Sequence, residues 1–482
     1  MQSPVNDAMK RVPLFLLGGL LAGAAGCTIA PKYERPEAPI EAQWPAGQAY
    51  STASDSGPLA AEVAWRDFIT DEKLRQLIDL ALANNRDLRS ATLNVELARA
   101  IYRVQRDSLL PALTASASGG KQHASAELVQ PNQPRTTESY SISAGVFAWE
   151  IDLFGRMRSM NRAALERFFA TREARRGAQT LLVSGVANAY LTLAADRDSL
   201  ALAESTLQAQ QAAYDLVGKQ HAAGIATELD LRQAQVPLET ARSSVAQFTR
   251  LVAQDENALA LLVGAPLPAG LQPSGLAEVA AFAEIRAGLP SEVLLQRPDV
   301  MQAEAELRAA NADVGAARAA FLPRISLTTT LGTGSRDLSG LFGTDNNTWS
   351  FLPGATMPIF DARTWTAHRG AQVQRELAVT HYERSIQSAF REVADTLATR
   401  GTLGEQLAAQ ERLVEALEET ERLATSRFEH GVDSFFAVLD AQRSLFSARQ
   451  GLVSLRLAYI ANRVRLYAVL GGGADVANAD AQ

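Results

Sequence analysis

The chain contains one stretch twice, and this duplication constrains the fold more than any other feature of the sequence. Residues 87–120 and residues 299–332 each read as a helix that stops at a proline, Pro111 or Pro323, and then continues as a strand. The segments that follow the two copies also repeat. Two copies of one helix–strand–strand–helix unit are therefore predicted.

Alternation of apolar and polar residues predicts two strands in each copy. The clearest case lies in the second copy, where Ile325, Leu327 and Leu331 alternate with small polar residues or glycine. This is the period of a strand with one apolar face. A loop rich in Gly, Asp and Asn separates it from a stretch that contains Trp349 and Phe351. The predicted strands are residues 112–120, 139–153, 324–332 and 347–360.

A very long helix follows each strand pair, and a shorter helix returns. The long helices are predicted over residues 155–221 and 361–430, and at about 1.5 Å per residue each would span roughly 100 Å. Both return helices carry an apolar residue at every seventh position, the pattern of a coiled coil. These columns are Leu231, Leu238, Val245, Val252 and Leu259 in the first copy, and Val438, Leu445, Leu452, Tyr459 and Leu466 in the second. The hairpins turn at Gly224 and Gly431.

The N-terminus has the features of a secretory signal. Two basic residues precede an apolar run, small residues and Cys27, the single cysteine of the chain, which is the order found in signal peptides. The residues that end at Cys27 resemble a bacterial lipobox, so a signal peptide over 1–26 and a covalent lipid on Cys27 are predicted. The alternative is ordinary cleavage near this point with a free thiol, which would be a liability in an oxidising compartment.

These elements define the fold class. The composition is rich in Ala, Leu, Gln, Glu and Arg and poor in aromatic residues, which is typical of long helices. No run of about 18 or more apolar residues, the length of a membrane helix, follows the N-terminus. If the strands span a membrane, an open four-stranded sheet would leave unpaired edges in lipid, which is not tolerated. We therefore predict a mostly α, internally duplicated protein with a membrane β-barrel that several copies of the chain close together.

The domain organisation follows from the repeats. An extended segment rich in Pro, Ala and Ser precedes the first repeat, and the Gly-, Ala- and Asp-rich C-terminus is predicted to be disordered. The segments are a signal peptide at 1–26, an extended segment at 27–70, a first repeat at 71–265, a linker at 266–298, a second repeat at 299–471 and a tail at 472–482.

Several short motifs resemble one known family. They are Trp65-Arg66-Asp67-Phe68, Asn85-Arg86-Asp87-Leu88, Trp149-Glu150-Ile151-Asp152-Leu153-Phe154-Gly155-Arg156, Gln296-Arg297-Pro298-Asp299-Val300 and Leu439-Asp440-Ala441-Gln442-Arg443-Ser444-Leu445. On these residues nearly the whole mature chain is similar to the TolC-like outer membrane factor family, in particular its lipoprotein branch of the OprM/NodT type. The resemblance implies a homotrimer in the cell outer membrane. Its twelve strands, four per chain, would form one barrel, and its long helices would form an α-barrel across the periplasm.

The resemblance also implies a function. The trimer would be the exit duct of a tripartite efflux pump and would conduct small molecules passively from the periplasm to the exterior. A periplasmic adaptor and an inner-membrane RND-type transporter would open its periplasmic aperture. No cofactor is implied apart from the covalent lipid on Cys27. Drugs and other small organic compounds are the expected cargo, which would contribute to antibiotic resistance, while metal-ion efflux and type I protein secretion remain open.

The same resemblance implies an aperture at the turn of the second hairpin. Asp440 matches a position where family members place a ring of carboxylates. Phe436, four residues earlier on the same helical face, matches an apolar constriction. Three carboxylates around a narrow axis would repel anions and favour cations. Arg427, Phe428 and Asp433 are predicted to make contacts that hold the aperture closed. The alternative for Asp440 is a solvated helix charge.

The two hairpin turns are the predicted docking sites for the adaptor. The residues concerned are Gly224, Ile225 and Ala226 in the first turn, and Gly431 and Val432 in the second. The alternative is ordinary turn chemistry, in which a glycine supplies a positive φ. Both interpretations can hold together, because an exposed turn at the end of a tube is also what an adaptor would meet.

Other function classes have less support in the sequence. The chain has no G-x-S-x-G, P-loop, H-E-x-x-H or paired-cysteine motif, so no enzyme is predicted. Its five histidines lack metal-ligand spacing, and its net charge of −7 argues against a nucleic-acid partner. A lipid-anchored periplasmic coiled-coil scaffold, with the strands as surface hairpins, remains the alternative from a different class.

Overall fold

The computed structural model describes residues 29–50 and 57–473, so the predicted signal peptide, Cys27 and most of the predicted tail lie outside the described residues. The chain forms two compact units. Of the described residues, the first comprises 29–36, Val95–Ala170 and Ala303–Tyr382, and the second comprises 37–50, 57–94, Thr171–Gln302 and 383–473. Each unit takes segments from both repeats, so the repeats at 71–265 and 299–471 are not separate compact domains.

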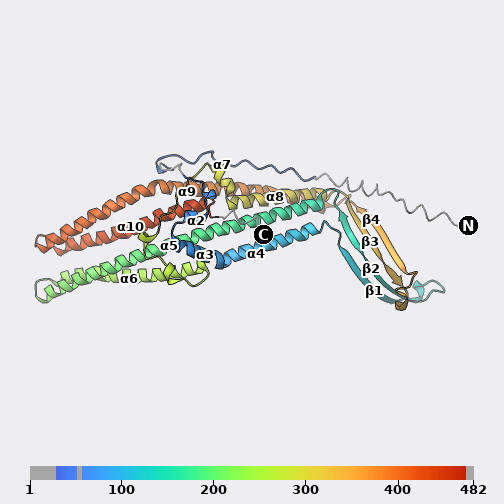
Figure 1. Cartoon of the computed structure of the whole chain (residues 1–482), viewed down its shortest axis with the longest axis horizontal. Coiled ribbons are helices and arrows are strands. Elements are labelled where there is room, and N and C mark those ends of the chain that lie inside the picture. The colour runs from blue at the N-terminus through green and yellow to red at the C-terminus, as the bar shows by residue number, and fades with distance from the viewer. Residues whose placement is uncertain (1–28, 51–56, 474–482) are drawn as a thin grey trace. The chain divides into compact units, whose positions relative to one another are not determined.

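The first unit contains one antiparallel sheet of four strands in the order β1-β2-β3-β4 (Figure 1). The two strands of each repeat pair with each other, and β2 of the first repeat pairs with β3 of the second. This central pairing explains why the repeats do not fold apart. The strands are β1 (Leu113–His123), β2 (Thr136–Ile151), β3 (Arg324–Ser335) and β4 (Asn347–Thr356).

The strand boundaries differ from the expected ones by a few residues, with one irregularity that was not expected. The register of β2 on β3 shifts between Val146 and Trp149. At this bulge Ala148 has a φ of 52°, and its N–H donates to Oγ1 of Thr328 at 2.9 Å. A bulge leaves a backbone group unpaired in the ladder, and here a threonine hydroxyl satisfies it. Alternation alone could not predict a residue that breaks the alternation.

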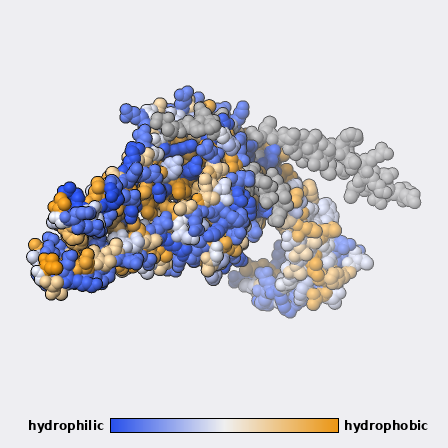
Figure 2. Space-filling view, turned by 60° about the vertical axis from the view of Figure 1, so that its left-hand side comes forward, coloured by the Kyte–Doolittle hydropathy of each residue, from blue (hydrophilic) through white to orange (hydrophobic). Residues whose placement is uncertain are grey.

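Large apolar side chains are exposed on the sheet. Leu331, Trp349, Phe351 and Leu352 are each more than half exposed, and orange patches cover part of the strand region in Figure 2. Apolar side chains in such numbers on one sheet indicate contact with lipid or with another chain. β1 and β4 each pair with one strand only.

The helices agree closely with the predicted ones, and the long helices after each strand pair begin and end within one residue of expectation. They are α2 (Trp65–Phe68), α3 (Glu72–Asn84), α4 (Arg86–Asp107), α5 (Arg156–Ala222), α6 (Glu228–Val263), α7 (Pro290–Val293), α8 (Pro298–Ala319), α9 (Ala362–Glu429) and α10 (Phe435–Val469). Short 3-10 helices occur at Gln48–Tyr50, Ala60–Glu62, Ala126–Leu128, Ala269–Leu271, Leu276–Glu278, Leu294–Gln296 and Leu338–Gly340.

In the first unit, the start of the described chain lies extended along α8. Arg35 donates to both carboxylate oxygens of Glu304, at 2.9 and 2.8 Å. Asn311 donates to the main-chain oxygen of Pro31 at 2.8 Å, and Gly315 leaves no room for a side chain against Ala30. Five extended residues and eleven helical residues both cover about 17 Å, so the two segments stay in register over this length.

The carboxylate of Glu304 is the centre of this contact. It also accepts from the Tyr33 hydroxyl at 3.1 Å and from Arg308 at 2.7 Å, and the residue is buried. Burial acts to raise the pKa of Glu304, but the hydrogen bonds from Arg35 and Arg308 outweigh it and hold that pKa below its usual value. The ionised carboxylate therefore fixes the extended segment on α8.

The core of the second unit lies where α3 meets α6. Leu74, Leu77 and Ile78 of α3 are fully buried, as is Leu259 of α6. Phe68 stacks on Tyr467 with ring centroids 4.0 Å apart. Farther along the second hairpin, the predicted heptad column is buried at Val438 and Leu445, whereas Tyr459 is 39% exposed.

Among the described residues, one helix is long and apolar enough to cross a membrane by length and composition. It is α5, and 61% of the apolar window that passes this test is buried inside the molecule. Such burial is typical of a core helix rather than of a membrane span.

A pair of aspartates joins α5 to α6 in the second unit and makes its stability depend on pH. The carboxyl groups of Asp196 and Asp255 interact with each other, and Oδ2 of Asp255 is buried without another hydrogen-bond partner among the described residues. Burial, together with the bond to Asp196 and its charge, raises the pKa of Asp255 from 3.8 to about 6. The folded state thus binds this proton more tightly than the unfolded state. The resulting stability is fully present below the unfolded pKa and is lost as the pH rises through about 6.

We therefore expect the protein to become more resistant to urea as the pH falls from about 7 to about 5. Asp255→Asn should flatten this slope and raise stability at neutral pH, because its amide can donate to Asp196 without a titrating proton. Glu256→Gln, at the neighbouring position where Glu256 pairs with Arg197 at 2.7 Å, is the control and should retain the slope. Equal slopes in wild type and Asp255→Asn would contradict the shared proton.

Candidate functional site at the ends of the helical hairpins

The first hairpin turns at Gly224, as predicted. This glycine has a φ of 74°, and the N–H groups of Ile225 and Ala226 donate to the main-chain oxygen of Gln220 at 2.8 and 3.3 Å. Thr227 then caps α6 in a capping box with Asp230. Because the turn satisfies its own backbone groups, the Ile225 side chain is free to point outward, and it is 77% exposed.

The second hairpin turns in the same way at Gly431. Its φ is 70°, and the N–H of Val432 donates to the main-chain oxygen of Arg427 at 2.9 Å. Val432 is also exposed. Both turns therefore present one aliphatic side chain next to a glycine in the left-handed conformation.

Arg427 and Asp433 pair with each other across the second turn. Arg427 donates to both carboxylate oxygens of Asp433, at 2.5 and 3.1 Å. This bidentate bond holds the pKa of Asp433 below its ordinary value. In the same turn, the ring centroids of Phe428 and Phe435 lie 5.1 Å apart. Within the chain, these three predicted aperture residues thus make contacts inside one hairpin.

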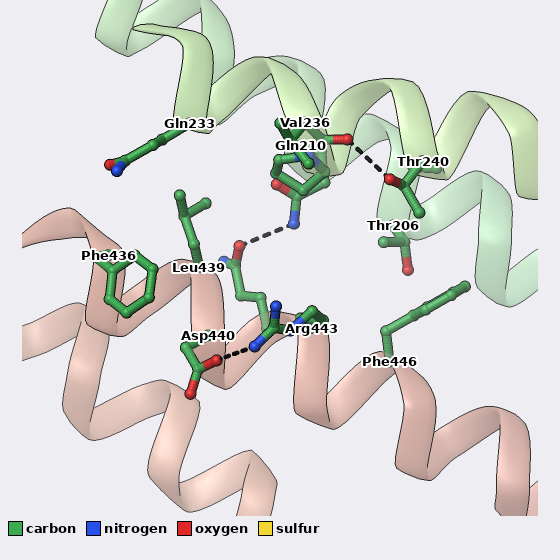
Figure 3. A pocket seen from close by; sticks show the side chains of 13 residues that line it. Thr206, Gln210, Gln233, Val236, Thr240, Phe436, Leu439, Asp440, Arg443 and Phe446 are labelled. Carbon is green, nitrogen blue, oxygen red and sulfur yellow. Dashed lines mark hydrogen bonds and ion pairs between the residues drawn. The ribbon is translucent and has the colours of Figure 1, made fainter. Parts of the chain in front are cut away.

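Asp440 and Phe436 line a pocket of about 250 Å³ between the two hairpins (Figure 3). Its walls come from α5, α6 and α10. Asp440 is exposed and forms an ion pair with Arg443, one helical turn later. Phe436 is 59% exposed. The structure therefore brings the two predicted aperture residues together, on a surface that α6 also borders.

A hydrogen-bonded bridge between two residues that line this pocket was not predicted. Nε2 of Gln210 in α5 donates to Oε1 of Gln442 in α10 at 2.9 Å, and Gln442 donates in turn to Glu421 in α9 at 3.2 Å. Gln442 lies within the motif Leu439–Leu445, and this motif is the sequence feature that could have pointed to it. Its partner Gln210 lies more than two hundred residues earlier in the chain, and no local pattern connects the two.

Across residues 29–50 and 57–473, no group of three or more His, Cys, Asp or Glu residues is arranged to hold a metal ion.

Comparison with known proteins identifies the family. The family model described as outer membrane efflux protein matches residues 77–265 and 289–472. The antibiotic efflux pump outer membrane protein ArpC of Pseudomonas putida is 45% identical, over 96% of this chain and 94% of its own. The solvent efflux pump outer membrane protein SrpC of Pseudomonas putida is 44% identical, over 97% and 99%.

A solved structure shows the same fold. The open state of the MtrE outer membrane channel of Neisseria gonorrhoeae superimposes with a TM-score of 0.84 at 36% identity, and the match covers 93% of this chain and 98% of that one. The four strands also form one continuous sheet and not separate surface hairpins. These findings overturn the alternative of a periplasmic coiled-coil scaffold. The chain belongs to the outer membrane efflux protein family and is an efflux channel protein of the outer membrane.

Proposed function

We propose that three copies of the chain close a twelve-stranded barrel and form the passive exit duct of a tripartite efflux pump. The observation that carries this proposal is the sheet. β1 and β4 each pair on one side only, and large apolar side chains are exposed on the strands. Unpaired backbone groups are not tolerated in lipid, so β4 of one chain would pair with β1 of the next until the barrel closes.

The extended N-terminal segment supports a lipid anchor on Cys27 in this assembly. Tyr33 and Arg35 hold the segment on Glu304, and its contacts continue along α8 towards the beginning of β3. The segment therefore runs along α8 with its N-terminal end towards the strands, and the strands are the part proposed to lie in the membrane. A lipid on Cys27 would then enter the same membrane.

The hairpin ends form the periplasmic aperture in this proposal. Asp440 from each chain would contribute to a ring of carboxylates, with Phe436 one helical turn away as an apolar constriction. The Arg427–Asp433 pair and Phe428 would keep the second turn rigid, because their contacts lie within one hairpin. The exposed turns at Gly224–Ala226 and Gly431–Val432 would meet a periplasmic adaptor, which with an inner-membrane RND-type transporter opens the aperture.

Small organic compounds are the proposed cargo. The names of two relatives, an antibiotic efflux pump protein and a solvent efflux pump protein, support this class. The channel supplies a path and not energy, so the transporter would supply the driving force and most of the selection.

The test is single-channel conductance of the purified protein in planar bilayers. Asp440→Ala should increase conductance and lower cation selectivity, because it removes the carboxylate ring from the narrowest point. Glu418→Ala is the matched control. Glu418 is a half-exposed carboxylate of the same hairpin, paired with Arg449, and it lies outside the pocket that holds Asp440.

Glu418→Ala should conduct like the wild type. An Asp440→Ala channel with unchanged conductance and selectivity would remove Asp440 from the aperture. The absence of any channel activity from folded, membrane-inserted wild type would refute the duct itself.

A further inference from the structure

The pocket between the hairpins has a size and a lining that suit a small molecule. It measures about 250 Å³, whereas an apolar cavity of about 150 Å³ holds a benzene molecule. Apolar walls come from Val236, Pro237 and Ala241 of α6 and from Leu439 and Phe446 of α10. A one-ring or two-ring molecule would fill this space.

One wall of the pocket contains a proline that leaves a helix carbonyl without its usual donor. Pro237 lies inside α6 and has no N–H, so the carbonyl of Gln233, four residues earlier, lacks its helical donor. Both residues line the pocket, and Figure 3 shows the Gln233 side chain beside it as well. The corresponding helix of the second repeat has no proline. An acceptor of this kind is matched by a ligand that carries a donor.

The opposite wall carries one carboxylate, that of Asp440. Asp440 borders the pocket, and although Arg443 pairs with it, its carboxylate stays half exposed. In Figure 3 Leu439 lies between Gln233 and Asp440, and the Gln210–Gln442 hydrogen bond crosses the middle of the pocket. Val236 and Phe446 complete the apolar part of the lining. This arrangement, an apolar body with a few placed polar groups, is typical of small-molecule sites.

We propose that this pocket binds a planar aromatic molecule of one or two rings that carries one hydrogen-bond donor, such as a phenol or an arylamine. The rings pack between α6 and α10, and the donor bonds to the Gln233 carbonyl. Because its walls come from both hairpins, an occupied pocket fixes their separation next to Asp440. This consequence for the aperture rests on the proposed function, whereas binding of the aromatic molecule to the pocket does not.

The experiment measures binding of 1-naphthol to the full-length protein by equilibrium dialysis. The matched probe is 1-methoxynaphthalene, which has the same rings and cannot donate. We expect saturable binding of one 1-naphthol per chain, and binding of the methoxy compound weaker by about fivefold to tenfold, the effect of one neutral hydrogen bond. Dialysis reads binding without any channel activity, so its failure is distinct from a failure of the exit-duct proposal.

Two variants test the two parts of the site. Val236→Trp places a large ring in the pocket and should abolish saturable binding of both probes. Its control is Leu229→Trp, seven residues earlier on the same helix, 64% exposed and outside the pocket lining, which should bind normally. Pro237→Ala restores the N–H that bonds to the Gln233 carbonyl and also favours the helix. The ratio of the affinities for 1-naphthol and 1-methoxynaphthalene should therefore fall towards one.

Three results would overturn the proposal. The first is no saturable binding to the wild type, as expected if a neighbouring chain or a partner helix fills the pocket. The second is unchanged binding by Val236→Trp, which would place the probe elsewhere, for example in the detergent. The third is an undiminished preference for 1-naphthol in Pro237→Ala, which would exclude the freed carbonyl as the acceptor.

Discussion

Replacing Arg297 by methionine should lower the free energy of unfolding of the protein by about 3 kcal/mol. The Arg297 side chain is 9% exposed. It donates to Asp299 at 2.7 Å, to Glu392 of α9 at 2.9 Å and to the main-chain oxygen of Val469 at 2.7 Å. Methionine would fill the space but leave these acceptors without their donor. Both carboxylates are partly exposed, so water can hydrogen-bond to them in place of Arg297. The expected destabilisation is therefore at the lower end of the range for breaking a buried ion pair.

Urea unfolding followed by circular dichroism measures this loss. Arg456→Met is the matched control, because Arg456 also joins two helices through a carboxylate, Glu411 at 3.1 Å, but both partners are about half exposed. Surface pairs contribute about 1 kcal/mol or less. Similar losses in the two variants would show that burial of Arg297 does not set its contribution.

A single methyl group at Gly145 should prevent assembly of the sheet. Gly145 lies in β2 opposite Thr330 of β3, and a Cβ atom there would meet the main-chain oxygen of Thr329 and the Cα atom of Thr330. These are backbone atoms, which cannot rotate away. We expect Gly145→Ala to reduce the protein recovered in the outer membrane by more than about tenfold, because the junction between the two repeats cannot close.

Gly120→Ala provides the comparison within the same sheet. A Cβ atom at Gly120 would lie 3.8 Å from the hydroxyl of Ser139, an ordinary contact, so this variant should assemble like the wild type. Membrane fractionation and electrophoresis of unheated samples would measure both. Normal recovery of Gly145→Ala would mean that the β2–β3 pair can separate enough to admit a side chain.

Much of the fold was predictable because its signals are local. The period of two in Ile325–Leu331 and the heptads around Leu445 depend on neighbouring residues only. The same holds for the turn glycines Gly224 and Gly431, whose φ values are positive as turn chemistry requires. The exception depends on a distant part of the chain. At Ala148 a bulge interrupts the ladder, and its partner Thr328 comes from the other repeat.

The candidate site was only partly predictable. The resemblance located Asp440 and Phe436, and the structure places both on one pocket. The resemblance did not identify Gln210, Gln233 or Pro237, which line the opposite side of the pocket. These residues belong to the first hairpin, and their sequence spacing from α10 carries no information about which face they share.

The sequence by itself determined the duplication, the type and length of the main elements and the residues of the turns, because hydrophobic period and glycine chemistry act within one element. Only the tertiary structure decided which buried polar groups meet. Arg297 with Glu392, Arg35 with Glu304 and Gln210 with Gln442 are each separated by roughly a hundred residues or more. A buried charge or amide requires a partner, but this requirement does not say which partner. Packing of the helices chooses it.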